Sequence, residues 1–249
     1  MTLMPEELAA LFAELMELAA TDPLDTQRVL RTCTRSGRRI YGSHGALVRY
    51  RPCDGSAGQT DGTSTALQDL AADALAWNEG PGHDAQAAGR PLVDVDVTGP
   101  GAQALWPRWA PRATALHYGR VTALPLAGHG SPVGALVLLG APDSAPADEQ
   151  LLACVHSLAS ITAHALSLQQ KTLESRAEAA QLQGALTSRV LIEQAKGALA
   201  ARHGLTTEEA FRLLRQYARS HRRKAAEVAR DVIDGRIDLS GQADAEWSE

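Results

Sequence analysis

The sequence has few aromatic residues, few cysteines and no long apolar run. Aromatic side chains make up 4% of its 249 residues, which favours helix packing through aliphatic and small side chains. Cys33, Cys53 and Cys154 show no C-x-x-C spacing, and an odd number of cysteines cannot form a closed set of disulfides within one chain. The longest apolar run, 133–141, is far shorter than the roughly 20 residues of a membrane-spanning helix. We therefore expect a soluble, cytoplasmic protein with no membrane segment.

Motifs of common enzymes and metal sites are also missing. Neither the nucleophile pattern G-x-S-x-G nor the phosphate loop G-x-x-x-x-G-K-[ST] occurs, and the eight histidines form no zinc spacing. Glu79, His83 and Asp84 could suggest acid–base chemistry, but we interpret them as a cap and a turn. Trp106 and Trp109 are expected to pack in a core. The sequence predicts no catalytic activity, no metal and no identifiable cofactor.

Positive charge is scarce overall but concentrated near the end of the chain. The net charge is −5, which would argue against a nucleic-acid partner. Between residues 186 and 236, however, eleven Lys and Arg stand against six Asp and Glu, so this segment carries +5 and the rest of the chain −10. Clustered cations are what phosphate binding requires. This segment is therefore the candidate for a nucleic-acid interface.

The first two thirds of the chain predict an α+β fold. An apolar repeat at helical spacing predicts a helix over 5–20, and a second helix should run from Thr26 to Arg35 and end near Gly37. The period then changes to that of short strands. The strands are expected at 46–50, 63–67, 92–97, 121–126 and 133–139, with helices at 69–77 and 106–118. The last two strands are a hairpin candidate, and one antiparallel sheet flanked by helices fits this order.

The last third predicts helices only. Residues 148–204 contain no proline or turn cluster, so one long helix is expected, with a polar middle that marks a domain boundary. Thr206 or Thr207 should cap a helix that ends near His221. A final helix is expected over 224–234, and the acidic tail, 240–249, should be disordered.

The helix that follows Thr207 should carry a row of arginines. At about 100° per residue, five arginines fall on roughly a third of its circumference: Arg212, Arg215, Arg219, Arg222 and Arg223. The opposite side holds Ala210, Phe211, Leu214, Tyr217 and Ala218. Guanidinium groups match phosphate oxygens and stack on bases. A solvated charged face would give the same pattern, and charge alone does not separate the two hypotheses.

The motifs of this segment resemble ANTAR domains. The resemblance rests on residues 186–199, L-T-S-R-V-L-I-E-Q-A-K-G-A-L, and on 201–224, which contain A-F-R-L-L-R-Q-Y-A-R and a basic turn. It implies a three-helix module over 181–239 that binds RNA hairpins in nascent transcripts and favours antitermination. The candidate RNA-binding residues are Arg189, Lys196, Arg212, Arg215, Arg219, Arg222, Arg223 and Lys224. Four small residues are expected at close helix contacts: Ala195, Gly197, Ala210 and Ala218.

The preceding segment, 21–166, resembles GAF domains. The residues that carry the resemblance are N-E-G-P-G-H-D-A at 78–85, P-L-V-D-V-D at 91–96 and W-P-R-W-A-P-R-A at 106–113. The resemblance implies a sensor domain with a pocket for a small molecule, whose identity the sequence does not reveal. Position 82 is glycine where these domains often carry cysteine, which puts sensing through a thiol at this position in doubt. The organisation expected is an N-terminal helix (1–20), this GAF-like domain, a helical or coiled-coil linker (167–180) and the RNA-binding module.

The sequence supports three hypotheses about function. The first is a signal-responsive RNA-binding antitermination regulator that forms a homodimer through the long helix. The second is a DNA-binding transcription factor with a GAF sensor, in which the helix before His221 would enter a major groove. The third is a GAF protein that binds a ligand or dimerises, or acts on a nucleotide, without binding nucleic acid. Its support is the weak apolar spacing of residues 151–173.

Overall fold

The computed structural model describes residues 5–21, 24–52, 55, 57–127, 131–146 and 148–239. The chain divides into two compact units, Met1–Thr172 and Leu173–Glu249, and the division falls within the segment 167–180. Cys53 and the acidic tail lie outside the described residues. The predicted α+β class is confirmed, because the first unit combines an antiparallel sheet with helices and the second is helical.

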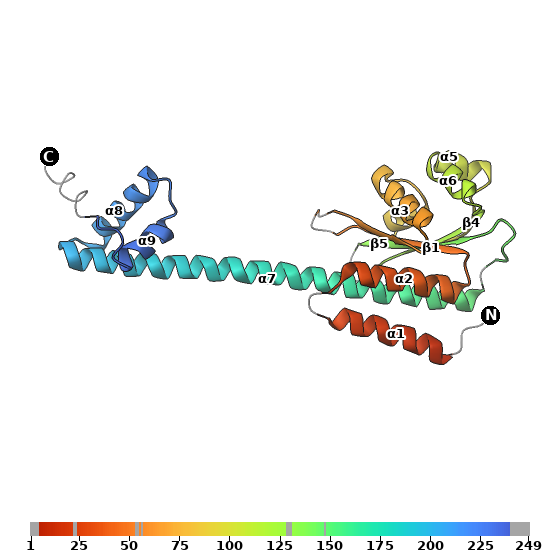
Figure 1. Ribbon diagram of the computed structural model, residues 1–249, viewed down its shortest axis with the longest axis horizontal. Coiled ribbons are helices and arrows are strands. Elements are labelled where there is room, and N and C mark those ends of the chain that lie inside the picture. Colours follow the sequence, from red (N-terminus) through yellow and green to blue (C-terminus); the bar gives the residue numbers. More distant parts are fainter. Residues whose placement is uncertain are drawn as a thin grey trace. The chain divides into compact units, whose positions relative to one another are not determined.

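The first unit contains a five-stranded sheet in the order β2-β1-β5-β4-β3, and all neighbouring strands are antiparallel (Figure 1). Its elements are α1 (Pro5–Ala20), α2 (Thr26–Tyr41), β1 (Gly45–Tyr50), β2 (Gln59–Gly62), α3 (Thr65–Trp77), α4 (Pro81–Ala88), β3 (Leu92–Asp96), α5 (Pro100–Leu105), α6 (Trp109–Ala115), β4 (Arg120–Pro125), β5 (Gly134–Gly140) and the first part of α7 (Glu149–His203). The predicted hairpin is confirmed by the pairing of β4 with β5, with Val121 opposite Leu139.

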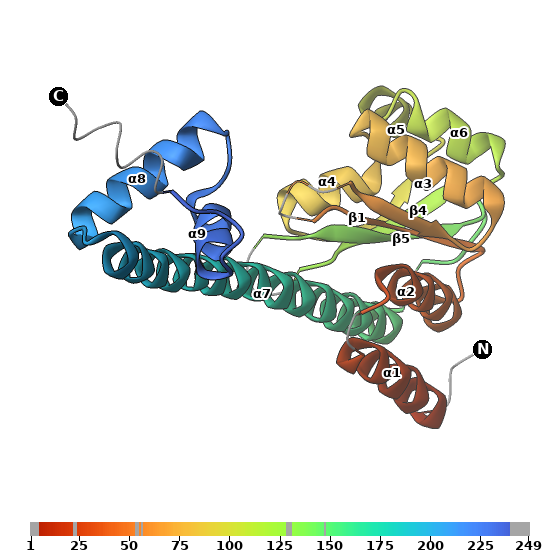
Figure 2. The same cartoon turned by 60° about the vertical axis from the view of Figure 1, so that its left-hand side comes forward.

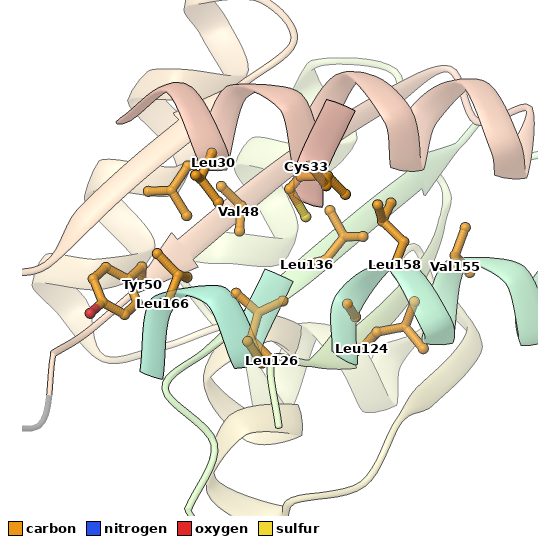
Figure 3. Packing of buried hydrophobic residues seen from close by; sticks show 14 of the residues in the cluster. Leu30, Cys33, Val48, Tyr50, Leu124, Leu126, Leu136, Val155, Leu158 and Leu166 are labelled. Carbon is orange, nitrogen blue, oxygen red and sulfur yellow. The ribbon is translucent and has the colours of Figure 1, made fainter. Parts of the chain in front are cut away.

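One face of the sheet is covered by α2 and the first part of α7, and α1 packs on the outer side of this helical layer (Figure 1). Leu30 and Cys33 of α2 meet Val48 and Leu136 of the sheet and Leu158 of α7, all of them fully buried (Figure 3). Burial raises the pKa of the Cys33 thiol to about 12, so the thiol stays protonated at neutral pH. The regularly spaced apolar side chains of residues 151–173 thus lie largely inside this core, because residues 155, 158 and 166 pack on the sheet.

The other face is covered by α3 to α6. Trp106 and Trp109 are buried with their rings edge to face, 5.6 Å between centroids, which confirms the predicted packing role. The Trp106 indole donates to Asp84 Oδ2 at 2.9 Å. Glu79 Oε1 accepts from the backbone N–H groups of Arg108 and Trp109 at 2.7 and 2.8 Å, so Glu79 does act as a cap, at the start of α6.

Four sequence predictions in the first unit are wrong or incomplete. The strand expected at 63–67 is a helix start, because the Ser64 hydroxyl accepts from the Leu67 N–H and caps α3, while β2 precedes it. Residue 37 does not end α2: it lies inside the helix, which continues to Tyr41 and is capped by Gly42 with a φ of 68°. His83 and Asp84 lie in α4 and not in a turn. The helix expected over 106–118 is shorter and follows a separate α5.

The second unit is formed by the last part of α7 with α8 (Thr207–Ser220) and α9 (Ala225–Ile233) (Figure 2). Small and aliphatic side chains make its core: Ala195, Leu199, Ala210, Leu214, Ala218, Val228, Ala229, Val232 and Leu239. The long predicted helix is confirmed, and Gly204, with φ of 66°, follows its end. Thr206 and Glu209 form a capping box at the start of α8, as their spacing predicts.

Among the described residues, α7 alone is long and apolar enough to cross a membrane by length and composition. Core helices of water-soluble proteins pass the same test. The apolar N-terminal part of α7 has such a position, since Val155, Leu158 and Leu166 are fully buried against the sheet.

Candidate nucleic-acid interface

The helix α8 has one buried and one cationic side. Ala210, Leu213, Leu214 and Ala218 are buried in the second unit. Arg212, Arg215 and Arg219 are exposed and recur at spacings of three and four, so they lie on one face of the helix. We call these three residues the α8 arginine row. The buried side holds the helix in place while the row presents guanidinium groups to solvent.

Lys196 of α7 joins this row through Phe211. The Lys196 ammonium lies 5.4 Å from the centre of the Phe211 ring, and the Arg215 guanidinium lies 5.5 Å from it. Both distances are within the range of cation–π interactions. Lys196 Nζ also donates to Glu193 Oε2 at 2.9 Å, and 18% of its side chain is exposed. The structure therefore brings together two cations that are 19 positions apart in the sequence, with a partly buried aromatic ring between them.

The prediction that Arg222 and Arg223 continue the row is wrong, because α8 ends at Ser220. His221 is the C-cap, and Arg222 has a left-handed φ of 52°, which turns the chain away from the helix axis. Arg223 Nη2 donates to Asp231 Oδ2 at 2.6 Å, and this hydrogen bond raises the pKa of Arg223 and lowers that of Asp231. Arg223 thus ties the turn to α9. Arg222 remains exposed beside the end of α8.

The remaining candidates lie on other elements. Lys224 is the exposed N-cap residue of α9, three positions after His221. Arg189 is exposed on α7 seven positions before Lys196, which places the two residues on nearly the same side of that helix. Arg202 Nη1 donates to the Val232 carbonyl oxygen at 3.0 Å, which connects α7 to the end of α9.

The small residues expected at helix contacts divide into two groups. Ala195 and Ala210 are completely buried and Ala218 is 4% exposed, so these three predictions are confirmed. Gly197 is exposed, and a Cβ placed on it would have no atom within 4 Å. The prediction that Gly197 allows close packing is wrong for the packing seen within the second unit.

Tyr217 stacks on the end of its own helix. Its ring and that of His221 are 3.9 Å apart between centroids and inclined by 19°, and Tyr217 also packs against the core of the second unit. Tyr217 thus lies on the side opposite the arginines, as its helical phase predicts, and stacks on His221 as well. His221 Nδ1 is held near the Tyr217 carbonyl oxygen at 3.0 Å, so the exposed imidazole has a defined position next to Arg222.

This arrangement can make two kinds of contact with a nucleic acid. A row of guanidiniums can track phosphate oxygens, while planar guanidinium, imidazole and aromatic groups can stack on unpaired bases. Phe211 is the residue that sequence reasoning missed as part of this surface, because its helical phase placed it on the apolar side. Its position four residues before Arg215, at the edge between the two faces, is the signal that could have identified it.

Comparison with known proteins identifies the domain in which these residues lie. Residues 180–233 match the ANTAR domain, so the chain carries such a domain over this range. The comparison with curated proteins found no match to this chain.

Among solved structures, the first unit is similar to GAF domains. The GAF domain/HD domain protein from Geobacter sulfurreducens is 18% identical, with a TM-score of 0.45 over 63% of this chain and 97% of that one. The second GAF domain of DevS from Mycobacterium smegmatis is 16% identical, with a TM-score of 0.44 over 62% and 99%.

Proposed function

We propose that this chain, which carries an ANTAR domain at residues 180–233, is a signal-responsive regulator that binds RNA hairpins in nascent transcripts and favours antitermination. The observation that carries the proposal is the group formed by Lys196, Phe211 and the α8 arginine row inside that domain. The chain works as a binding regulator in the cytoplasm and not as an enzyme. Its first unit is the sensor.

The cations of the site have different roles in this proposal. The α8 arginine row and Arg189 contact phosphates, which supplies affinity without sequence preference. Lys196 and Arg215, held by Phe211, contact the loop of a hairpin, where bases are unstacked and accessible. Arg222 and Lys224 extend the cationic surface beyond the end of α8, whereas Arg223 is partly neutralised by Asp231 and contributes least.

A second copy of the chain is the proposed partner of α7. Leu182, Leu186 and Val190 recur every four residues on one side of α7 and are 64%, 58% and 47% exposed. Apolar side chains at such spacing are covered in helical pairs. A homodimer would bury this stripe and present two RNA modules to tandem hairpins. A signal in the sensor would then act by shifting the population between two pairings of α7.

The test that separates RNA from DNA uses the full chain. RNA that copurifies with the protein is sequenced, and its hairpins are synthesised and titrated against the protein. Duplex DNA of the same length is titrated at the same salt concentration. We expect hairpin RNA to bind at least tenfold more tightly than the duplex. Equal or tighter binding of duplex DNA would favour the transcription-factor hypothesis, in which α8 enters a major groove.

A double variant tests the assignment of the row. Replacing Arg215 and Arg219 with alanine should weaken hairpin binding and lower the dependence of log K on log salt by about 0.7–0.9 for each lost phosphate contact. Arg230→Ala is the matched control, because Arg230 is an exposed arginine of the same unit outside the proposed site. If the double variant binds as tightly as the wild type at every salt concentration, the row is not the RNA site.

Light scattering tests the proposed dimer. The full chain should have the mass of two copies, and replacing Leu182 and Leu186 with glutamine should give the mass of one, because polar side chains remove the apolar stripe without changing helix propensity greatly. Leu173→Gln is the control, since Leu173 is 49% exposed on α7 but lies nine positions before Leu182, on the opposite side of the helix. A wild-type chain with the mass of one copy would contradict this part of the proposal.

A further inference from the structure

A buried arginine lies between the sheet and α4. Arg49 is in β1, and it follows Leu47 by two positions, so its side chain points to the face covered by α3 to α6, where Leu47 is buried. Arg49 is only 2% exposed. Its Nε and Nη1 atoms are buried and have no hydrogen-bond partner among the residues that the structure describes. A cation in this situation is costly unless an anion accompanies it.

The glycine at position 82 makes room for this side chain. A Cβ on Gly82 would lie 3.2 Å from Arg49 Cδ and 3.0 Å from Val137 Cγ2, both closer than ordinary contacts. The Arg49 side chain therefore passes directly under the first turn of α4. The absence of a side chain at position 82 and the buried arginine belong to one local arrangement.

A cavity of about 340 Å³ opens next to Arg49. Arg51, His83 and Gln86 contribute to its lining, and none of the described residues that line it is acidic. Gln86 Nε2 donates to the Pro132 carbonyl oxygen at 3.1 Å, which fixes this side chain at the cavity wall. The nearby carboxylate of Asp84 already accepts the Trp106 indole N–H through its Oδ2 atom. In the described part of the chain, the wall of this cavity thus holds basic side chains and no carboxylate.

The pKa shifts of Arg49 and His83, and the charge of Arg51 beside them, agree with this geometry. Burial lowers the pKa of Arg49 to about 10, with the charge of Arg51 acting in the same direction and that of Asp84 opposing it, so Arg49 is still a cation at neutral pH. Burial and the charge of Arg49 also lower the pKa of His83, which is therefore neutral and can donate one hydrogen bond. A bound anion would relieve the repulsion between Arg49 and Arg51 and supply the missing hydrogen-bond acceptor.

We propose that this cavity binds the oxyanion group, phosphate or carboxylate, of a small molecule, with Arg49 as the buried anchor and Arg51, His83 and Gln86 around it. The volume is at the lower end of the range for small-molecule pockets, which is about 300–1,000 Å³. A small, compact metabolite therefore fits better than a large cofactor. The inference rests on the sensor role proposed above for the first unit and names the class of molecule that the unit senses.

Calorimetric titration of the full chain in a chloride buffer tests the proposal with two probes, inorganic phosphate and succinate. We expect saturable binding of at least one probe and an increase in the melting temperature of the first unit. Binding of phosphate alone assigns a phosphate group to the natural ligand, and binding of succinate alone assigns a carboxylate. If neither probe binds at millimolar concentration, the proposal is wrong.

Variants distinguish the cavity from other basic surfaces. Arg49→Gln should weaken binding of the probe by about 10- to 100-fold, the range for a lost hydrogen bond to a charged group. Arg51→Gln, which changes an exposed side chain, gives the same test if Arg49→Gln does not fold. Arg28→Gln is the matched control, since Arg28 is exposed on α2 outside this cavity. Unchanged binding in both cavity variants would contradict the proposal.

The two proposals can fail separately. Binding of the probe is measured without RNA, and hairpin binding is measured without the probe. Arg49→Gln should bind hairpin RNA as the wild type does when no anion is added, because Arg49 is in the first unit and the RNA site is in the second. Loss of probe binding with intact RNA binding therefore reports on the cavity alone.

Discussion

Two helices of this molecule carry matching rows of arginine, yet their surroundings differ. Arg31, Arg35 and Arg38 are exposed on α2 at spacings of four and three, and we call them the α2 arginine row. They mirror the α8 arginine row in number and in angular spread. Both helices bury small and aliphatic residues on the opposite side. The rows alone therefore do not tell which helix binds nucleic acid.

The neighbours of each row make the difference. The α2 arginine row lines a cavity of about 690 Å³ together with the first turn of α3 and with Asp61, whose carboxylate is buried and accepts from the Thr34 hydroxyl at 2.5 Å. The α8 arginine row is joined by Lys196 and by the Phe211 ring. A further cation and a carboxylate accompany each row, because Arg39 also lines the α2 cavity and Glu193 accepts from Lys196. The Phe211 ring distinguishes the α8 arginine row, since the described lining of the α2 cavity contains no aromatic residue and an aromatic face can stack on bases. The comparison teaches that a basic helix becomes specific through the elements packed beside it.

The largest difference is expected when the buried side of each helix is weakened. Leu30 of α2 and Leu214 of α8 are both 0% exposed. Replacing either with alanine should cost about 2–5 kcal/mol of stability. Three of the four tryptophans, at positions 77, 106 and 109, lie in the first unit. In urea unfolding, Leu30→Ala should shift the fluorescence transition, whereas Leu214→Ala should shift helical circular dichroism with little change in fluorescence. Equal fluorescence shifts would show that the units unfold together.

The next largest effect is expected when the charges of the two arginine rows are removed. Changing the three arginines of the α8 arginine row to glutamine should weaken hairpin binding about 100-fold if each lost contact contributes about 1 kcal/mol. The same change in the α2 arginine row should alter binding less than about twofold, because the charge lost is equal but the first unit is not the proposed RNA site. Fluorescence anisotropy with labelled hairpin RNA measures both. A similar loss in the two variants would mean that only overall charge matters.

A smaller effect is expected at the N-terminal caps. Asp25 caps α2 through one hydrogen bond, from the Arg28 N–H at 3.0 Å. Thr206 caps α8 in a reciprocal pair with Glu209, whose carboxylate accepts from the Thr206 N–H at 2.7 Å. Either change to alanine should cost about 1 kcal/mol. We expect Thr206→Ala to be the more damaging in thermal melts because the Glu209 carboxylate also loses the threonine hydroxyl as a donor. The opposite order would indicate that the capping box adds nothing.

The smallest effect is a difference in acid sensitivity. The backbone N–H of Thr206, with its hydroxyl, lowers the pKa of Glu209 below its ordinary value of 4.5. The stabilisation by this carboxylate is therefore complete above that value and is lost as the pH falls through the lower, folded pKa. Helix α2 has no acidic residue in its first turn. In thermal melts between pH 6 and 3, Glu209→Gln should reduce the pH dependence of the melting temperature of the second unit and leave that of the first unit unchanged. An unchanged response would contradict this role of Glu209.

Much of the fold could be predicted where local chemistry and tertiary packing agree. The α7 helix, the α8 capping box and the β4–β5 hairpin each have a strong local signal, and each is present. Gly37 shows the opposite case: glycine suggests a helix end, but here it lies against Leu136 and the helix continues. The segment 63–67 contains β-branched threonines, which favour a strand, but the Ser64 cap starts the helix α3 there.

The candidate site was predictable only in part, for a geometric reason. Helical phase identifies Arg212, Arg215 and Arg219 because they share one helix. It fails for Arg222 and Arg223, since the helix ends before them and Arg223 turns to Asp231. Contacts between elements, such as Lys196 with Phe211 or the burial of Arg49 under α4, depend on packing that no local pattern encodes.

The exposed stretch of α7 affects how fast the backbone amides of this helix exchange their hydrogens. Every residue from 171 to 187 is exposed, so no tertiary packing protects the helix there. An unsupported helix of this length is marginally stable in water. Its backbone amides should exchange hydrogen for deuterium within the shortest labelling times in a single copy, and slowly when a second copy covers them. The amide exchange rate of this stretch therefore reports whether α7 has paired with a second copy of the chain.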